Sequence, residues 1–326
     1  MVSDPPVVAI DIGGTKIAAA LVTPDGRTHA LINLPTEAKQ GGEAVMERVQ
    51  NLVDELIQIS IAPGARITPA AVGVGTAGQV ALKRGVISFA TSALPGWVGM
   101  PVKDRLEQAC GLPVFVENDA NVMALGESAF GAGRGCRHII GLTVGTGVGG
   151  GIIIDGRIYH GAHGIAGGIG HIHIDYRGQR QCPCGRYGCL EAFASTQGIV
   201  AEYLQVAAPE VVENLGITPD QLGVKQIAAL AYAGDADAWG AILRGAEYLG
   251  VGITTLINLF DPEMVVVGGG IANLGDPYFD RVRTVVRDSV LPSLAETPIL
   301  PAQLGDQANL IGAACIAWQG LELSGW

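Results

Sequence analysis

Apolar residues in this chain form two kinds of pattern, short β-branched runs and longer stretches with helical spacing. The run Val7–Ile12 ends in glycines and resumes at Ile17–Val22, before a hairpin turn at Pro24-Asp25-Gly26-Arg27. This pattern predicts a strand, a glycine turn and a second strand. From Glu43 to Ile59 the apolar residues instead repeat at the period of an amphipathic helix. The chain is therefore predicted to be an α/β protein.

A second copy of the strand, glycine turn and strand begins 132 positions after the first. Ile139–Val144 leads into Gly145-Thr146-Gly147, and Val148–Ile154 then ends at the turn Asp155-Gly156-Arg157. Two similar hairpins, each opening one half of the chain, predict a duplicated domain. Chance similarity between glycine-rich strands is the alternative explanation.

Asn118 and Asp119 fall where a predicted strand meets a predicted helix. The strand over Pro113–Val116 leads into these residues, and the helix continues through Phe130. In open α/β sheets, ligands collect at this edge. Further predicted elements are strands over 70–75 and 264–267, and helices over 102–110, 246–260 and 307–318.

The composition narrows the class of protein. A length of 326 residues predicts two domains with a cleft between them. The formal charge of −11 disfavours binding to nucleic acid or to anionic membranes. The longest apolar stretch, Ile139–Ile154, is interrupted by six glycines, and Met1–Pro6 lacks the pattern of a secretory signal. We therefore expect a soluble protein.

One histidine and three cysteines lie close together in sequence: His171, Cys182, Cys184 and Cys189. One imidazole and three thiolates can surround a tetrahedral Zn²⁺, and four protein ligands leave no open position for a catalytic water. A structural zinc site is therefore predicted. The alternative is three reduced cysteines beside a hydrogen-bonded histidine. The other cysteines are scattered, which together with thiolate ligands predicts a reducing cytoplasm.

Three glycine-rich segments follow predicted strands and offer backbone N–H groups to phosphate. Gly13-Gly14-Thr15-Lys16 adds a hydroxyl and an ammonium group, and Asp11 before it can face a hydrated Mg²⁺. Gly145-Thr146-Gly147 is a second segment of the same kind, and Gly268-Gly269 would let a nucleotide lie close to the backbone. A single glycine loop is most often only a turn, but two related loops facing each other would bind a triphosphate.

Asp119 is the best-placed general base for phosphoryl transfer to a hydroxyl group. That reaction needs an acceptor held in line and a carboxylate that takes its proton. A position at a helix N-terminus is expected to help keep Asp119 ionised, and the amide of Asn118 can bind a sugar hydroxyl. The alternative is that Asp119 only caps the helix.

The motifs together resemble those of the ROK family (repressors, open reading frames, sugar kinases), in the same order and over nearly the whole chain. The matching segments are Asp11-Ile-Gly-Gly-Thr-Lys16, Glu117-Asn-Asp119, Gly145-Thr-Gly-Val-Gly-Gly150, Gly161-Ala-His-Gly-Ile-Ala-Gly167, Gly170-His171 and Cys182-Pro-Cys-Gly-Arg-Tyr-Gly-Cys-Leu-Glu191.

The resemblance implies a duplicated, actin-like and hexokinase-like two-domain fold that binds ATP and Mg²⁺ in the cleft. It implies glucokinase-like phosphorylation of a hexose at its 6-hydroxyl. We expect a small domain formed by residues 1–118 and 305–326, and a large domain formed by residues 119–304. The resemblance also implies a homodimer or homotetramer.

Site residues follow from the resemblance position by position. Asp119 is then the general base, and Asn118 is a sugar ligand. His171 would bind zinc through one ring nitrogen and sugar through the other, Glu191 would bind a sugar hydroxyl, and Gly75 would line the sugar side.

Two positions depart from the family pattern. Gly168 stands where a sugar-binding Glu is usual, and Ala93 stands where Asn is common. A sugar-sensing protein with low activity and altered specificity is therefore the alternative to a hexose kinase. A repressor would need a DNA-binding domain before Asp11, where only ten residues stand, so no nucleic-acid partner is expected.

Overall fold

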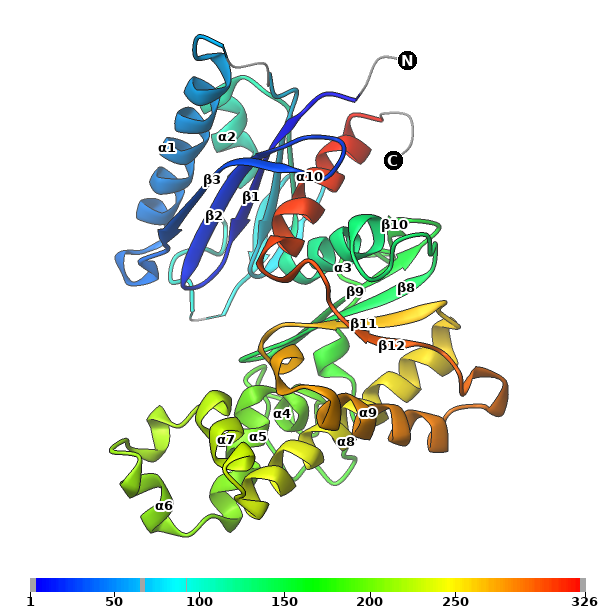
Figure 1. Cartoon of the computed structure of the whole chain (residues 1–326). Helices are drawn as coiled ribbons and strands as arrows, with labels where there is room; N and C mark the ends of the chain where they lie inside the picture. Colours follow the sequence, from blue (N-terminus) through cyan, green and yellow to red (C-terminus); the bar gives the residue numbers. More distant parts are fainter. Residues whose placement is uncertain (1–3, 65–67, 92, 323–326) are drawn as a thin grey trace. The chain divides into compact units, whose positions relative to one another are not determined.

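The computed structural model describes residues 4–64, 68–91 and 93–322, and the chain divides into two compact units (Figure 1). The first unit comprises Met1–Arg137, Gly151–Gly167 and Gln303–Trp326, and the second comprises His138–Gly150 and Gly168–Ala302. Each unit contains its own cluster of buried apolar side chains.

The first unit is built on a five-stranded sheet in the order β3-β2-β1-β4-β7. Strands β1, β4 and β7 are parallel, and their register aligns Asp11 with Gly75 and Gly75 with Glu117. Parallel strands end at the same edge, so these three residues lie side by side. The strands are β1 (Val7–Ile12), β2 (Lys16–Val22), β3 (Thr28–Pro35), β4 (Val72–Thr76) and β7 (Val114–Asn118), with a separate hairpin of β5 (Gln79–Ala81) and β6 (Val86–Phe89).

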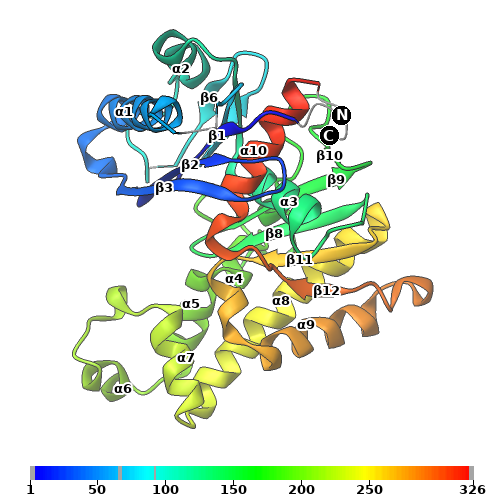
Figure 2. The same ribbon diagram turned by 45° about the horizontal axis from the view of Figure 1, so that its top comes forward.

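Helices cover both faces of this sheet (Figures 1 and 2). Helices α1 (Gly42–Ile61) and α2 (Val102–Cys110) bury their apolar residues on one face. Helices α3 (Asp119–Phe130) and α10 (Ala308–Gly320) pack against each other on the opposite face. The predicted helix over 43–59 is confirmed as α1. It buries Val45, Val49 and Val53, which recur every four residues.

The second unit contains β8 (Ile139–Val144), the first three residues of β9 (Val148–Ile154), β11 (Met264–Gly268) and β12 (Ile299–Pro301). With β10 (Arg157–Ile158) these strands form a sheet in the order β10-β9-β8-β11-β12. Its helices are α4 (Glu191–Ala194), α5 (Thr196–Val206), α6 (Pro209–Asn214), α7 (Val224–Tyr232), α8 (Ala236–Phe260) and α9 (Asp276–Ser289). Short 3-10 helices are η1 (Ala38–Gln40), η2 (Ile169–His171), η3 (Pro219–Gln221), η4 (Gly270–Leu274), η5 (Pro292–Leu294) and η6 (Gly305–Gln307).

The two sheets have the same internal order. In each, a glycine-turn hairpin (β1–β2 or β8–β9) is followed across the sheet by two further strands, β4 and β7 or β11 and β12. Strand β1 pairs in parallel with β4, and β8 pairs in parallel with β11. The repeat seen in the sequence is therefore also a repeat of topology.

The units differ from the expected division at helix α3. We expected the large domain to begin at Asp119, but α3 belongs to the first unit and the chain passes to the second unit after Arg137. Close backbone packing explains this placement, because a Cβ atom on Gly312 of α10 would lie 1.7 Å from the carbonyl oxygen of Val122 in α3. Residues 151–167 also belong to the first unit, and the chain returns to it at Gln303 rather than at 305.

Helix α8 is longer than the pattern indicated. The predicted start was Ala246, but the helix begins at Ala236 after the N-cap Asp235, whose carboxylate accepts the Ala238 N–H at 2.9 Å. Small residues such as Ala238 and Ala241 are fully buried in this first part. Because alanine side chains are small, these positions contribute little to the apolar pattern. The helical spacing therefore became recognisable only from Ala246.

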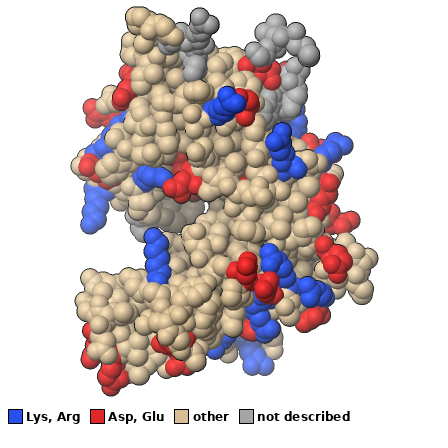
Figure 3. All heavy atoms as spheres, in the orientation of Figure 1, with Lys and Arg blue, Asp and Glu red and all other residues tan. Residues whose placement is uncertain are grey.

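Charged side chains of both signs lie interspersed on the face of the molecule drawn in Figure 3. Among the described residues, none of the helices combines the length and the apolar character needed to cross a membrane.

Candidate active site and metal centre

Asn118 and Asp119 occupy the turn between strand β7 and helix α3. Asn118 is the N-cap, and its side-chain oxygen accepts the N–H groups of Ala120 and Asn121 at 3.0 and 3.3 Å. Asp119 is the first helical residue. Asn118 therefore caps helix α3. The alternative, in which Asp119 is only the cap, is wrong.

The carboxyl group of Asp119 lies beside that of Asp11. Burial, and then the negative charge of Asp11, raise the pKa of Asp119 to about 7. Burial also raises the pKa of Asp11, although the Asn309 side chain donates to its Oδ1 at 3.0 Å. The expectation that the helix N-terminus keeps Asp119 ionised is thus corrected. Loss of hydration and a neighbouring like charge outweigh the hydrogen bonds that favour the carboxylate.

Both polar atoms of the Asn118 side chain form two hydrogen bonds each in this structure. Its Nδ2 donates to the carbonyl oxygen of Gly78 at 2.9 Å and to Oδ1 of Asp119 at 2.8 Å, while its Oδ1 accepts two backbone N–H groups. An amide has two N–H donors and an oxygen with two lone pairs. A sugar hydroxyl would therefore have to replace one of these partners.

The buried carboxylate of Glu117 supports the same turn, although no role for this residue was proposed from the sequence. Oε1 of Glu117 accepts the Asn118 N–H at 2.7 Å and the Asn121 side-chain N–H at 2.9 Å. Its Oε2 lies 2.6 Å from Nε2 of His160. Glu117 stands in the quoted Glu117-Asn-Asp119 motif, but His160 lies 43 residues away, and no local pattern links the two.

The first glycine turn is fixed by backbone hydrogen bonds. The N–H of Gly13 donates to the carbonyl of Lys16 at 2.9 Å, and the hydroxyl of Thr36 donates to the carbonyl of Gly13 at 2.7 Å. The Lys16 side chain is 45% exposed, and its ammonium lies 3.7 Å from the carboxylate of Asp306. Gly14 and Thr15 complete the turn. Gly75 packs closely beneath α3, where a Cβ would lie 2.7 Å from Val122.

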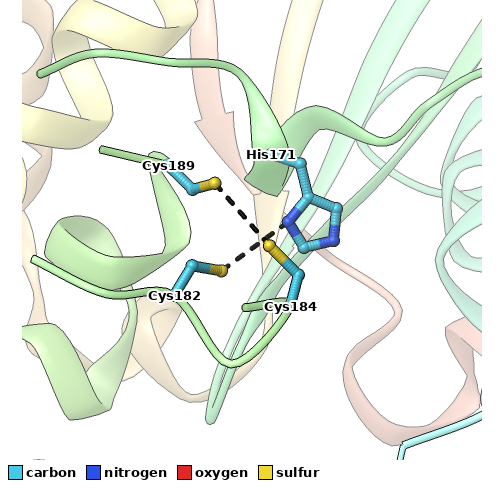
Figure 4. A group of neighbouring side chains, drawn as sticks. All are labelled: His171, Cys182, Cys184 and Cys189. Atoms are coloured by element: carbon cyan, nitrogen blue, oxygen red, sulfur yellow. Dashed lines mark hydrogen bonds between the residues drawn. The ribbon is translucent and has the colours of Figure 1, made fainter. Parts of the chain in front are cut away.

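The second unit gathers His171, Cys182, Cys184 and Cys189 into one cluster (Figure 4). Their ligand atoms all lie within 4.8 Å of one another. Nδ1 of His171 is 3.8 Å from the Cys182 sulfur, and the sulfurs of Cys184 and Cys189 are 3.8 Å apart. With Zn–S bonds of about 2.3 Å, the edges of a ligand tetrahedron measure about 3.8 Å. The residues therefore fit a tetrahedral metal ion.

Glycines shape the loop that carries the three sulfurs. Gly185 and Gly188 have φ values of +84° and +78°, in the left-handed region that favours glycine. At Gly188 a Cβ would also lie 2.2 Å from the carbonyl oxygen of Asp175. These turns allow the chain to fold back between Cys182 and Cys189.

The second glycine turn adjoins this loop. The N–H of Gly145 donates to the carbonyl of Gly147 at 2.9 Å, and the backbone N–H of Val148 donates to Oε2 of Glu191 at 2.9 Å. Thr146 lies between the two glycines. At the end of β11, Gly268 leads into Gly269, whose φ is +84° and whose Cβ would lie 2.5 Å from the carbonyl oxygen of Val144.

The two departures from the family pattern differ in their surroundings. A Cβ built on Gly168 would have nothing within 4 Å, and the φ of this residue is −68°. Ala93 is exposed, and its Cβ lies 3.5 Å from the position that a Cβ on Gly14 would occupy. Position 168 could therefore carry a larger side chain without a steric clash.

Two α/β units with matching sheets, each opening on a glycine-turn hairpin, define the class of the actin-like ATPase fold. The ROK family model matches residues 7–319, so the chain belongs to the ROK family. The glucokinase of Halalkalibacterium halodurans is 35% identical over 97% of this chain and 96% of that protein.

Solved structures agree with this assignment. A ROK hexokinase from Thermus thermophilus has a TM-score of 0.82 and 34% identity, covering 97% of this chain and 99% of that chain. A ROK family glucokinase from Streptomyces griseus, in complex with glucose and AMPPNP, has a TM-score of 0.81 and 37% identity. The match covers 97% of this chain and 100% of that chain. The predicted fold is confirmed.

The raised pKa of Asp119 gives a test that does not depend on activity. The folded-state pKa of about 7 lies above the ordinary value of 3.8. The unfolded chain therefore loses this proton first, and stability falls as pH rises between these values. Asp119→Asn keeps the Oδ1 acceptor but cannot ionise. We expect equal stability at pH 4, and at pH 8 a gain for the variant of about 1–3 kcal/mol, reduced from the full shift by water access.

Thermal unfolding of both proteins at pH 4, 6 and 8 would measure this difference. An unfolding temperature for Asp119→Asn that stays equal to or below that of the wild type at pH 8 would contradict the raised pKa.

Proposed function

We propose that this protein transfers the γ-phosphoryl group of ATP to the 6-hydroxyl of a hexose, with Asp119 as the general base. The observation that carries the proposal is the half-buried Asp119 carboxyl, whose Oδ2 is left over by the hydrogen bonds to Oδ1 and whose pKa is raised to about 7. Such a group can take a proton near neutral pH. The glucokinase names of relatives and the glucose and AMPPNP of the Streptomyces griseus complex support ATP and a hexose as substrates.

Proton transfer and phosphoryl transfer are coupled in the proposed reaction. The hydroxyl oxygen forms a bond to the γ-phosphorus while the bond to the bridging oxygen of ADP breaks. The hydroxyl proton passes to Asp119. We assign it to Oδ2, because Oδ1 already accepts from Asn118 and Ala120. Most of the rate comes from alignment and from neutralising phosphate charge, so the base need only be near and ionised.

Other residues have proposed roles in binding. Asp11 would hold a hydrated Mg²⁺, which supplies charge neutralisation on the phosphates. Lys16 and the N–H groups of both glycine turns would bind phosphate oxygens, and Gly268 and Gly269 would lie against the nucleoside. Asn118, His171 and Glu191 would bind sugar hydroxyls, with Gly75 lining the sugar.

A zinc ion is proposed as a structural component of the second unit. His171 through Nδ1 and the three cysteine sulfurs would hold it, and the exposed imidazole would keep Nε2 for the sugar. Such an ion has four protein ligands and supplies rigidity rather than a reactive water. Thiolate ligation is consistent with our prediction of a cytoplasmic, reducing environment, and a homodimer or homotetramer remains a prediction from the family.

The kinase proposal is tested by ADP release with glucose, mannose, fructose and N-acetylated hexosamines. We expect sugar-stimulated turnover with at least one of them, and Asp119→Asn should lower kcat by about 10²–10⁴-fold. Because the base must be deprotonated, kcat/KM should fall tenfold per pH unit below about 7. No turnover across the panel would overturn the proposal. Most activity remaining in Asp119→Asn would remove only its role as the base.

The zinc proposal is tested with Cys184→Ser, using Cys110→Ser as the matched control outside the cluster. Loss of one thiolate should release the ion, loosen the loop and raise the KM for sugar by at least about tenfold. Elemental analysis should find one zinc per chain in the wild type and in Cys110→Ser. Absence of metal from active wild-type protein would refute this part.

Gly168 favours a second candidate function, a sugar-sensing protein of low activity. A missing acceptor at this position costs about 1.5–3 kcal/mol if the sugar approaches it, or ten- to a hundredfold in affinity. The space around position 168 is open. We therefore expect Gly168→Glu to bind glucose ten- to a hundredfold more tightly, while Gly168→Ala, which adds only a methyl group, leaves the affinity unchanged.

Calorimetric titration of glucose into the three proteins would measure this. Weaker or unchanged binding by Gly168→Glu would show that the sugar contacts at this position are arranged differently.

A further inference from the structure

The second glycine turn is held from one side by the segment that follows Cys189. The Val148 N–H, directly after the turn, donates to Oε2 of Glu191 at 2.9 Å. The carbonyl of Gly145, at the start of the turn, accepts the N–H of Thr196 at 2.8 Å. Both ends of the turn are thus tied to the stretch that contains α4 and the start of α5.

Gly147 is required by this contact rather than by backbone conformation. Its φ lies outside the left-handed region, so an alanine could adopt the same backbone angles. A Cβ on Gly147 would, however, lie 2.5 Å from Oε2 of Glu191. The missing side chain is what lets the carboxylate reach the backbone of the turn.

Glu191 adjoins the cluster formed by His171, Cys182, Cys184 and Cys189. Glu191 is two residues beyond Cys189, and its Oε1 lies 3.4 Å from the Cys182 sulfur. Its carboxylate therefore lies between the cluster and the turn. A hydrogen bond from a backbone N–H to a carboxylate is stronger than one between neutral groups, so this contact can order a flexible glycine segment.

We infer that Glu191 is a positioning residue for the second phosphate-binding turn, in addition to its proposed contact with sugar. It holds the Val148 end of the turn so that the N–H groups of the preceding residues face a phosphate. This inference rests on the proposed function, in which that turn binds the phosphates of ATP. It implies that the metal-cluster loop supports nucleotide binding even when no sugar is present.

The test is the affinity for AMPPNP with Mg²⁺, measured by calorimetry in the absence of sugar. Glu191→Ala should weaken binding by about tenfold, since the turn loses a charge-assisted hydrogen bond. Glu191→Gln keeps an oxygen that accepts the Val148 N–H and should stay within about threefold of the wild type. A sugar contact alone would leave all three affinities equal, because sugar is absent.

Gly147→Ala tests the contact between Glu191 and the turn by changing the turn. Its methyl group should displace the carboxylate and weaken nucleotide binding, but add less than about twofold in the Glu191→Ala background. Gly240→Ala is the matched control, because its Cβ would meet only the Arg244 guanidinium at 3.6 Å, and it should bind as the wild type does.

The outcomes separate this inference from the proposed function. Unchanged affinity in Glu191→Ala, or a full additional loss from Gly147→Ala in the Glu191→Ala background, would overturn the inference while leaving the kinase proposal intact. A wild-type protein with no affinity for AMPPNP would overturn both.

Discussion

The first unit depends on two carboxylates placed together at the end of one sheet. Asp11 is the penultimate residue of β1, Asp119 follows β7, and β4, in which Gly75 pairs with Asp11, lies between those strands. Burial and mutual repulsion disfavour two negative charges there, which is why the pKa of Asp119 rises to about 7. The proposed roles of Asp119 as the proton acceptor and of Asp11 as the residue that faces Mg²⁺ both rest on this arrangement.

Side chains from distant segments keep this arrangement in place. Asn309 of α10 donates to Asp11, and the buried Glu117 holds the backbone of Asn118 while meeting His160. Each contact satisfies a polar group that burial would otherwise leave unpaired. The carboxyl ends of β1 and β7 are therefore held by α10 and by the segment that contains His160, in addition to the hydrogen bonds within their own turns.

In the second unit, a neighbouring loop and the residues after it hold the glycine turn. A loop that carries three cysteines folds back through Gly185 and Gly188, and the residues after it reach Gly145 and Val148. In the proposal, a zinc ion held by His171 and the three sulfurs would order this loop. Because Glu191 follows this loop and accepts the Val148 N–H, the inference couples the order of the loop to the order of the turn.

Local patterns were enough to predict the hairpins, helix α1 and the metal cluster. Their signals, glycine after a strand, apolar residues at helical spacing and closely spaced thiols, depend on residues near one another in sequence. The unit to which α3 belongs was not visible there, because it depends on the close packing of Gly312 in α10 against α3. The start of α8 was missed for a local reason, since its first turns bury alanines that give little apolar signal.

By itself, then, the sequence determined which chemical groups this protein has and in which turns they lie. Only the tertiary structure decided the pKa values of these groups and their hydrogen-bond partners. The pKa of Asp119 depends on burial and on a carboxylate 108 residues earlier in the chain. The pairing of Glu117 with His160 and of Asp11 with Asn309 joins segments that share no local pattern. Desolvation and long-range hydrogen bonds arise only when the chain is folded, so no window along the sequence contains them.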